Sequence, residues 1–185
     1  VVRLLGRGAT CHVYEARREG VAVPLALKVL LPIMAQHPEL RGRFLREAEV
    51  AMRMRHPNLV AVYDAAEVDG VAYLAMERLD GEDLETRLAR EGRLSVPDVV
   101  AVMAPVCRGV AEAHRLGVAH RDLKPANIFL ARDVDGRVVP KVLDFGTARV
   151  LDDERPPIAG DDDNLTGTGV LLGTAHYMAP EQCLG

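Results

Sequence analysis

Side chains suited to phosphate chemistry stand close together between residues 120 and 146. Asp122 can orient a hydroxyl group and accept its proton. Lys124 can neutralise a phosphate in transfer, and Asn127 can coordinate a metal ion. Seventeen residues after Asn127, Asp144 can hold Mg²⁺ between phosphate oxygens. Each residue alone also fits a turn or a helix cap, but the whole set in this order predicts a site for phosphoryl transfer.

A glycine-containing hairpin and a lysine precede this set. Gly6 and Gly8 lie between two expected strands, where glycines let the backbone approach phosphates closely, although a plain β-turn also explains them. Lys28 lies on the next expected strand. Only three of the 23 basic residues are lysines: Lys28, Lys124 and Lys141. In a chain that otherwise uses arginine, lysine at positions 28 and 124 favours a compact ammonium beside phosphates.

Glu47 lies on the helix expected after Lys28 and has two interpretations. Arg43 and Arg46 are close in sequence, so Glu47 fits an exposed helix surface. It equally fits an ion-pair partner that holds the Lys28 ammonium toward a nucleotide.

Composition narrows the class of protein. The chain has 185 residues, of which 49% are hydrophobic and 27% charged, and these fractions are typical of a folded globular domain. A net charge of −4 disfavours a nucleic-acid partner. No apolar run is long enough for a membrane span, and no signal peptide is recognisable. Cys11, Cys107 and Cys183 show no metal or disulfide spacing, so we expect a reduced, cytoplasmic setting.

The elements that position these residues begin with a β-rich third. Strands are expected at Val1–Leu5, Val13–Ala16 and Leu25–Leu31. A helix opens at Pro38, carries Glu47 and ends at His56-Pro57. Two more strands, Leu59–Tyr63 and Val71–Met76, are joined by a turn at Asp69-Gly70.

The second part of the sequence is mainly helical around the chemical residues. A short helix is expected near Asp83–Arg90, and a longer one starts at Ser95, which fits a capping box, and runs to Leu116-Gly117. Short strands near Ile128–Leu130 and Val138–Leu143 turn at Asp135-Gly136. The stretch from Thr147 to Gly173 is polar and acidic and predicts a surface loop.

These motifs resemble the eukaryotic-like (Hanks-type) protein kinases, and most closely the bacterial serine/threonine kinases. The likeness runs from residue 1 to residue 185 and includes the glycine loop, Ala26-Leu27-Lys28, Phe44–Glu47, His56-Pro57-Asn58, the stretches around Asp122 and Asp144, and Gly173–Glu181. It implies an α+β, two-lobed protein-kinase fold. Residues 1–76 would form a small β-rich N-lobe with one long helix, residues 77–80 a hinge, and residues 81–185 the first part of a mainly helical C-lobe.

The resemblance also implies roles for individual residues. ATP would be the phosphate donor and Mg²⁺ its metal ion, with Mn²⁺ as an alternative. The implied catalytic residues are Asp122, Lys124, Asn127, Lys28 and Glu47, and the implied metal ligands are Asn127 and Asp144. The implied ATP-binding residues are Leu5, Gly6, Gly8, Val13, Ala26, Lys28, Met76, Glu77, Leu79, Asp83 and Phe129. Among these, Met76 would be the gatekeeper, the Glu77 and Leu79 backbones would bind adenine, and Asp83 would reach the ribose.

Two features depart from the family pattern. Cys11 occupies the position of the third loop glycine, which we expect to affect nucleotide affinity more than activity. The chain starts inside a strand and stops at Gly185, so we expect the C-lobe to be truncated after the activation segment. The Ser95–Leu116 helix would then expose apolar surface, and the 185-residue chain would associate and show little activity.

Regulation is implied by Arg121 and by the threonines of the expected loop. In the family, an arginine before the catalytic aspartate pairs with a phosphorylated loop residue. Thr166 and Thr168 are the implied phosphosites, and the resemblance places Thr174 beside Asp122 and Lys124, as in kinases that phosphorylate serine and threonine. Phosphorylation by a second copy of the chain is the implied route.

Two other classes of function are consistent with parts of the sequence. A nucleotide-binding pseudokinase scaffold is disfavoured because Lys28, Asp122, Asn127 and Asp144 are all present. A small-molecule kinase is disfavoured by Gly173–Glu181, which in the family shapes a peptide-binding surface. We therefore expect protein substrates with serine or threonine, no nucleic acid, and a cytoplasmic domain without a membrane segment of its own.

Overall fold

A five-stranded antiparallel sheet forms the first half of the molecule in the computed structural model, which describes residues 1–20, 23–144, 149–150 and 175–184. Its strands are β1 (Arg3–Arg7), β2 (Cys11–Ala16), β3 (Leu25–Leu30), β4 (Val62–Val68) and β5 (Val71–Glu77). They lie in the order β1-β2-β3-β5-β4. Asp69 and Gly70 both adopt positive φ between β4 and β5, which confirms the hairpin turn expected there.

Two helices between β3 and β4 cover the sheet. They are α1 (Pro32–Ala35), which was not expected, and α2 (Pro38–Arg53), which starts at the predicted proline. Ala48 of α2 is almost fully buried and packs with Val62 and Leu74 of the sheet. Phe44 also packs against this group. The apolar face of the helix therefore fixes the side of the sheet on which Glu47 lies.

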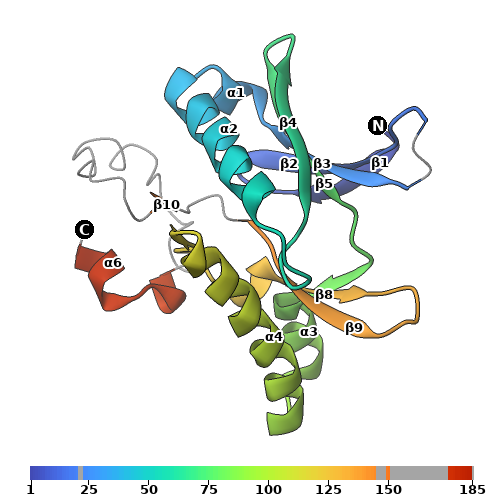
Figure 1. Cartoon of the computed structure of the whole chain (residues 1–185), viewed down its shortest axis with the longest axis vertical. Coiled ribbons are helices and arrows are strands. Elements are labelled where there is room, and N and C mark those ends of the chain that lie inside the picture. The colour runs from blue at the N-terminus through green and yellow to red at the C-terminus, as the bar shows by residue number, and fades with distance from the viewer. Residues whose placement is uncertain (21–22, 145–148, 151–174, 185) are drawn as a thin grey trace.

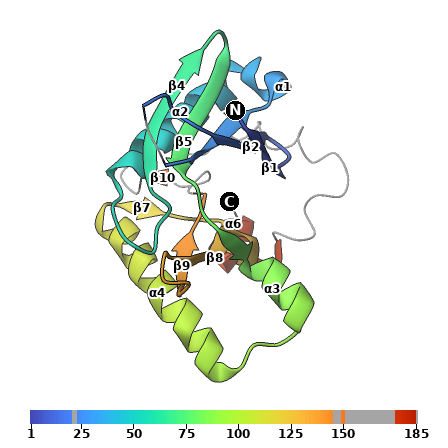
Figure 2. The ribbon, with the colours of Figure 1, turned by 90° about the vertical axis from the view of Figure 1, so that its right-hand side faces the viewer.

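The second half combines helices with a small three-stranded sheet. The helices are α3 (Leu84–Glu91), α4 (Val96–Arg115) and α6 (Pro180–Leu184), with short 3₁₀ turns η1 (Pro125–Asn127) and η2 (Ala175–Tyr177). The sheet has the order β6 (Gly81–Asp83), β8 (Ile128–Arg132), β9 (Val138–Val142), while β7 (Val118–Ala119) pairs with β10 (Arg149–Val150). Figures 1 and 2 show the five-stranded sheet with α1 and α2 at one end of the molecule and α3 and α4 at the other.

The cap of α4 was predicted from the sequence, and that of α3 was not. The Ser95 hydroxyl accepts a hydrogen bond from the Asp98 amide at 3.3 Å, as expected for the start of α4. Asp83 caps α3. Among the described residues, no helix has both the length and the apolar character needed to cross a membrane.

The strand predicted at Leu59–Tyr63 is wrong over its first residues. β4 begins only at Val62 and continues to Val68. The preceding stretch, residues 58–60, pairs instead with β9 of the other half. The Val60 amide donates to the Val142 carbonyl at 3.0 Å, and the Val142 amide donates to the Asn58 carbonyl at 2.9 Å. The short strand β6 was also missed, because its three residues gain their partner only from β8.

A glycine in α4 permits this contact between the halves. Gly109 is buried, and a Cβ at this position would lie 2.9 Å from the Asn58 carbonyl oxygen and 3.0 Å from the Leu59 Cδ2 atom. Leu59 is 1% exposed and packs in the same apolar cluster as Val106 and Val142. The absence of a side chain at 109 thus lets the stretch 58–60 lie directly on α4.

One side of α4 exposes apolar side chains, as expected for this helix: Val100 is 59% exposed, and Cys107 is an exposed free thiol. Val96 and Val99 are also exposed, at 77% and 42%. The opposite face of α4 carries the buried residues Val102, Val106 and Ala113.

Replacing Gly109 with alanine should destabilise the protein by about 1–3 kcal/mol, because the added methyl group overpacks against backbone that cannot move easily. Gly42→Ala is the matched control. Gly42 lies inside α2, where an added Cβ would meet only the end of the flexible Arg46 side chain, so alanine there should stabilise by about 0.5–1 kcal/mol. Chemical denaturation of both variants measures the difference, and equal effects would contradict this account of Gly109.

Candidate active site

One oxygen of the Asp122 carboxylate is held by neighbouring side chains, and the other has no hydrogen-bond partner among the described residues. The Asn127 side-chain amide donates to the Asp122 carbonyl at 2.7 Å and to its Oδ2 atom at 3.1 Å. The Lys124 ammonium lies 2.9 Å from the same Oδ2 atom. The Oδ1 atom is buried and has no hydrogen-bond partner among the described residues. A buried carboxylate oxygen in this position is a ready acceptor for a hydroxyl proton.

A buried histidine sets the backbone of this stretch. His120 is 3% exposed. Its Nε2 atom lies 2.8 Å from the Leu143 carbonyl oxygen, to which the ring N–H donates, while its Nδ1 atom accepts from the Asp122 amide at 3.3 Å. This pattern requires the neutral ring. Burial lowers the pKa of His120, which favours the same state.

The histidine also connects Asp122 with Asp144. Leu143, whose carbonyl accepts from His120, donates its own amide to the Asn127 carbonyl at 2.9 Å. Asp144 follows it directly, with a left-handed backbone at φ 49°. Sequence reasoning placed His120 in the motif but gave it no role, because its partner is a carbonyl group distant in sequence.

The Lys28 ammonium reaches from β3 across to Asp144, with 2.5 Å between Nζ and Oδ1. Burial by itself would lower the pKa of Lys28, but the Asp144 carboxylate opposes this, and the pKa is raised. Lys28 is therefore fully charged in the folded protein. The structure brings together these two predicted residues although 116 positions separate them.

The expected ion pair between Lys28 and Glu47 is not formed in this structure. These two described residues have no N–O approach within 4.0 Å, whereas Asp144 occupies the position beside the ammonium. Burial raises the pKa of Glu47 to about 7, against the opposing effect of Arg43 and Lys28. The Glu47 carboxyl group is thus close enough to Lys28 for the ammonium to oppose this rise of its pKa, but it forms no ion pair with Lys28.

The predicted nucleotide-binding residues of the N-lobe line β1, β2, β3 and β5. Gly8 closes the hairpin between β1 and β2, where its amide donates to the Cys11 carbonyl at 2.8 Å. Ala26 is buried and pairs with Met76, and Val13 pairs with Lys28. Leu5 lies on β1 and is 39% exposed.

Cys11 packs into the N-lobe core. It is buried with Leu30, Ala35 and Ala72, and burial raises the pKa of its thiol. At the position of the third loop glycine, the side chain therefore points into apolar packing. It holds one end of the hairpin to the sheet.

The remaining predicted residues lie at the junction between the halves. Glu77 is the last residue of β5, and its side chain forms an ion pair with Lys141 at 2.7 Å. Asp83 uses both carboxylate oxygens on Thr86, accepting from its amide at 2.7 Å and its hydroxyl at 3.0 Å. Its contact with a ribose stays a prediction. Phe129 is half-buried on β8, and Leu79 follows β5.

The start of α6 contacts the stretch around Asp122 through a residue that sequence reasoning missed. The Gln182 side chain donates to the Arg121 carbonyl at 2.7 Å and accepts from the Ala179 amide at 3.1 Å. Arg121 has a left-handed backbone at φ 63°, and this bond satisfies its carbonyl. The predicted regulatory residues Thr166, Thr168 and Thr174 lie outside the described residues.

The family model described as protein kinase domain matches residues 1–184. This chain belongs to the protein kinase family. A probable serine/threonine-protein kinase of Corynebacterium efficiens, CE0033, is 38% identical over 185 residues, covering 98% of this chain and 26% of the relative. Serine/threonine-protein kinase Pkn1 of Myxococcus xanthus is 39% identical over 185 residues, covering 100% of this chain and 25% of the relative.

Solved structures agree with this family assignment. The crystal structure of the Mycobacterium tuberculosis PknI kinase domain superposes with a TM-score of 0.69 at 40% identity, covering 80% of this chain and 59% of that domain. The two-lobed kinase fold expected from the sequence is therefore confirmed. The chain spans about a quarter of the length of the curated relatives named above.

Glu47→Gln should stabilise the protein more at pH 8 than at pH 5. The pKa of Glu47 rises from an ordinary 4.5 to about 7 on folding, so the folded state holds a proton that the unfolded state releases. The stability that this proton contributes is complete below pH 4.5 and is lost as the pH rises through 7. The neutral amide avoids that loss, and the gain at pH 8 should be roughly 1–3 kcal/mol.

Denaturation at both pH values measures this difference, with Glu49→Gln as the control on the exposed side of the same helix. A pH-independent effect of Glu47→Gln would show that the carboxyl group is ionised in the folded protein at both pH values.

Proposed function

We propose that this protein transfers the γ-phosphate of ATP to serine and threonine hydroxyls of other proteins. The observation that carries the proposal is the Asp122 carboxylate, with Oδ2 held by Asn127 and Lys124 and Oδ1 buried and unpaired among the described residues. Membership of the kinase family supports it, as do relatives named serine/threonine-protein kinases.

Asp122 acts as the general base in this proposal. Its Oδ1 atom accepts the proton of the substrate hydroxyl, whose oxygen forms a bond to the γ-phosphorus. The bond from that phosphorus to the bridging oxygen of ATP breaks, and the electron pair leaves with ADP. Lys124, 2.9 Å from Oδ2, lies where it can neutralise charge on the transferred phosphate.

The residues present also fit a hard divalent cation. Asn127 uses its amide nitrogen on Asp122, so its side-chain oxygen is not engaged by a hydrogen bond among the described residues and could coordinate, and Asp144 supplies a carboxylate. Oxygen ligands in small number are what Mg²⁺ takes when phosphates complete its coordination. We infer Mg²⁺ as the ion, with Mn²⁺ as an alternative, and it would supply charge neutralisation on the ATP phosphates.

The base and ribose of ATP would lie between the sheet and the second half of the molecule. We propose Leu5, Val13, Ala26, Met76 and Phe129 as its apolar surround. The Glu77 and Leu79 backbones would bind adenine, and Asp83 would reach the ribose. Gly6 and Gly8 would cover the phosphates, and Lys28 would hold them, with Glu47 as its ion-pair partner once the nucleotide is bound.

The proposed setting is the cytoplasm. Cys11 and Cys107 are free in the described part of the chain, as expected in a reducing compartment. The partners would be proteins with accessible serine or threonine, and a second copy of the chain during autophosphorylation.

Asp122→Asn should lower kcat by about 10²–10⁴, the usual effect of losing a general base. ATP affinity should change little, because the amide is isosteric with the carboxylate and leaves the Lys28–Asp144 pair intact. The measurement is peptide phosphorylation by the full-length protein with radiolabelled ATP, together with ATP binding by calorimetry. Asp135→Asn, in an exposed turn, is the control. Undiminished kcat in the Asp122 variant would refute the proposed base.

Thr166→Ala/Thr168→Ala should lower activity at least several-fold, because phosphates on these threonines would pair with Arg121 and order the predicted loop. Phosphosite mapping by mass spectrometry after incubation with ATP and Mg²⁺ should find both threonines modified. The alternative is that Asp161, Asp162 and Asp163 already supply the negative charge. Unmodified threonines in an active enzyme, combined with loss of activity when those three aspartates become asparagine, would establish that alternative instead.

A further inference from the structure

Lys141 is the one lysine of the chain that phosphate chemistry does not explain. Lys28 and Lys124 lie beside Asp144 and Asp122, while Lys141 lies on β9. The remaining 20 basic residues are arginines. A compact ammonium at this third position therefore needs a reason of its own.

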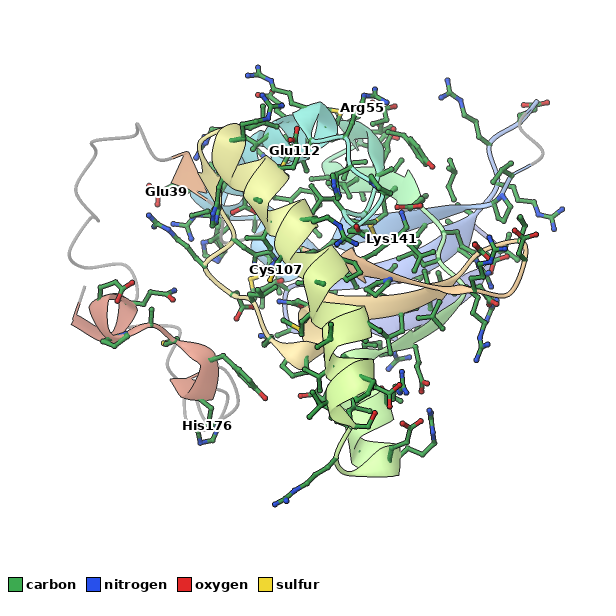
Figure 3. All side chains as sticks on the ribbon, turned by 60° about the horizontal axis from the view of Figure 1, so that its bottom comes forward. Glu39, Arg55, Cys107, Glu112, Lys141 and His176 are labelled. Carbon is green, nitrogen blue, oxygen red and sulfur yellow. The ribbon has the colours of Figure 1, made fainter. Side chains whose placement is uncertain are left out.

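The Lys141 ammonium joins two segments from the first half of the molecule. Its Nζ atom lies 2.7 Å from Glu77 Oε1 and 3.5 Å from the Leu59 carbonyl oxygen. The two side chains of the ion pair are only 14% and 20% exposed. Figure 3 shows Lys141 on β9 close to the segment that leads from α2 to β4. A guanidinium is longer and forked, and a site this enclosed suits it less well.

Glu77, at the end of β5, is also held by two hydrogen bonds with Ala61. Its Oε1 atom also accepts from the Ala61 amide at 2.7 Å, and its own amide donates to the Ala61 carbonyl at 2.9 Å. The segment that carries Ala61 is held on β9 through the hydrogen bonds of Val60 and Val142. Removal of Lys141 would leave a largely buried carboxylate with only a neutral donor, and the chain at Glu77 would be free to shift away from it.

Phe129, one of the residues proposed to surround the base, is also a neighbour of Lys141. Phe129 of β8 pairs directly with Lys141 in the β8–β9 register, so both side chains leave the sheet on one face. Lys141 thus lies beside Phe129, which is proposed to surround the base, and forms an ion pair with Glu77 of the proposed hinge. The phosphate-binding groups are held by contacts that do not involve the Lys141 side chain, namely those of His120, Leu143 and Asn127 and the backbone pairing of β9 with residues 58–60.

We propose that Lys141 is a positioning residue for the base of the nucleotide. It holds Glu77, and with it the backbone at the end of β5, in the place where that backbone binds adenine. This inference rests on the proposed function, since it assigns the base to this region. A backbone that is already fixed binds the base without first losing conformational freedom. Lys141 should therefore increase the affinity for the base of ATP and leave the affinity for its phosphates unchanged.

The test compares ligands with and without a base, using the full-length protein. Calorimetry gives the Kd of ATP and of inorganic tripolyphosphate, both with Mg²⁺, for wild type, Lys141→Met and Glu77→Gln. Methionine keeps the apolar stem and removes the charge. We expect Lys141→Met to raise the Kd and the KM of ATP about 5–20-fold, with the Kd of tripolyphosphate and kcat both within about two-fold of wild type.

The partner variant shows whether the ion pair is responsible. Glu77→Gln keeps an oxygen for the Ala61 amide and loses the charge, so it should raise the Kd of ATP less than Lys141→Met does. The double variant should be no worse than Lys141→Met alone. Lys141→Arg, which keeps the charge, should recover part of the ATP affinity.

The possible outcomes distinguish failure of this inference from failure of the proposed kinase function. Equal losses for ATP and tripolyphosphate, or a lower melting temperature with unchanged KM for ATP, would show that Lys141 is only a structural support. If Lys141→Met does not fold, unchanged ATP affinity in Glu77→Gln overturns the inference by itself. Wild type that binds ATP more tightly than tripolyphosphate yet transfers no phosphate would refute the proposed function and leave the Lys141 comparison valid.

Discussion

Backbone hydrogen bonds between Val142 and the stretch 58–60 join the two halves of this molecule. β9 uses one edge to pair with β8, and its other edge accepts the segment between α2 and β4. Because β9 leads directly into Leu143 and Asp144, the same contact sets where the Asp144 carboxylate lies relative to Lys28. The buried Asn58 side chain adds to it by donating to the Pro140 carbonyl at 2.9 Å. Gly109 makes room for the whole arrangement.

The ion pairs that matter here are those that join the two halves. Lys28–Asp144 and Lys141–Glu77 both do so. The side chains of Lys141 and Glu77 are largely buried, so their charges interact more strongly than in water and either one unpaired would be costly, whereas the Asp144 side chain is 45% exposed. Surface pairs such as Arg87–Glu91 and Arg115–Glu112 stay within one helix and contribute little to stability, because water and salt screen exposed charges. The pairs between the halves thus bear on how the halves are placed, whereas the pairs within one helix do not.

Local signals predicted most elements correctly. Pro38 predicted the start of α2, Ser95 predicted the start of α4, and Asp69-Gly70 predicted the hairpin turn. The prediction failed at Leu59, where an apolar run resembles a strand of the sheet. Leu59 pairs instead with Val142, 83 residues away, through hydrogen bonds of the neighbouring Asn58 carbonyl and Val60 amide, and no local pattern records such a partner. The missed strand β6 fails for the same reason, since a three-residue strand exists only through its neighbour.

The sequence by itself determined which side chains are available for chemistry: Asp122, Lys124, Asn127 and Asp144 at fixed spacings, with Lys28 kept in a chain of arginines. Residue types and spacing suffice for that, because each role needs a particular functional group. The tertiary structure alone decided which groups meet. It placed Lys28 on Asp144 in preference to Glu47, gave His120 the Leu143 carbonyl and gave Lys141 the Glu77 carboxylate. These partners are far apart along the chain. Their contacts form only when the two halves pack together along β9, and the local sequence pattern of either half does not specify that packing.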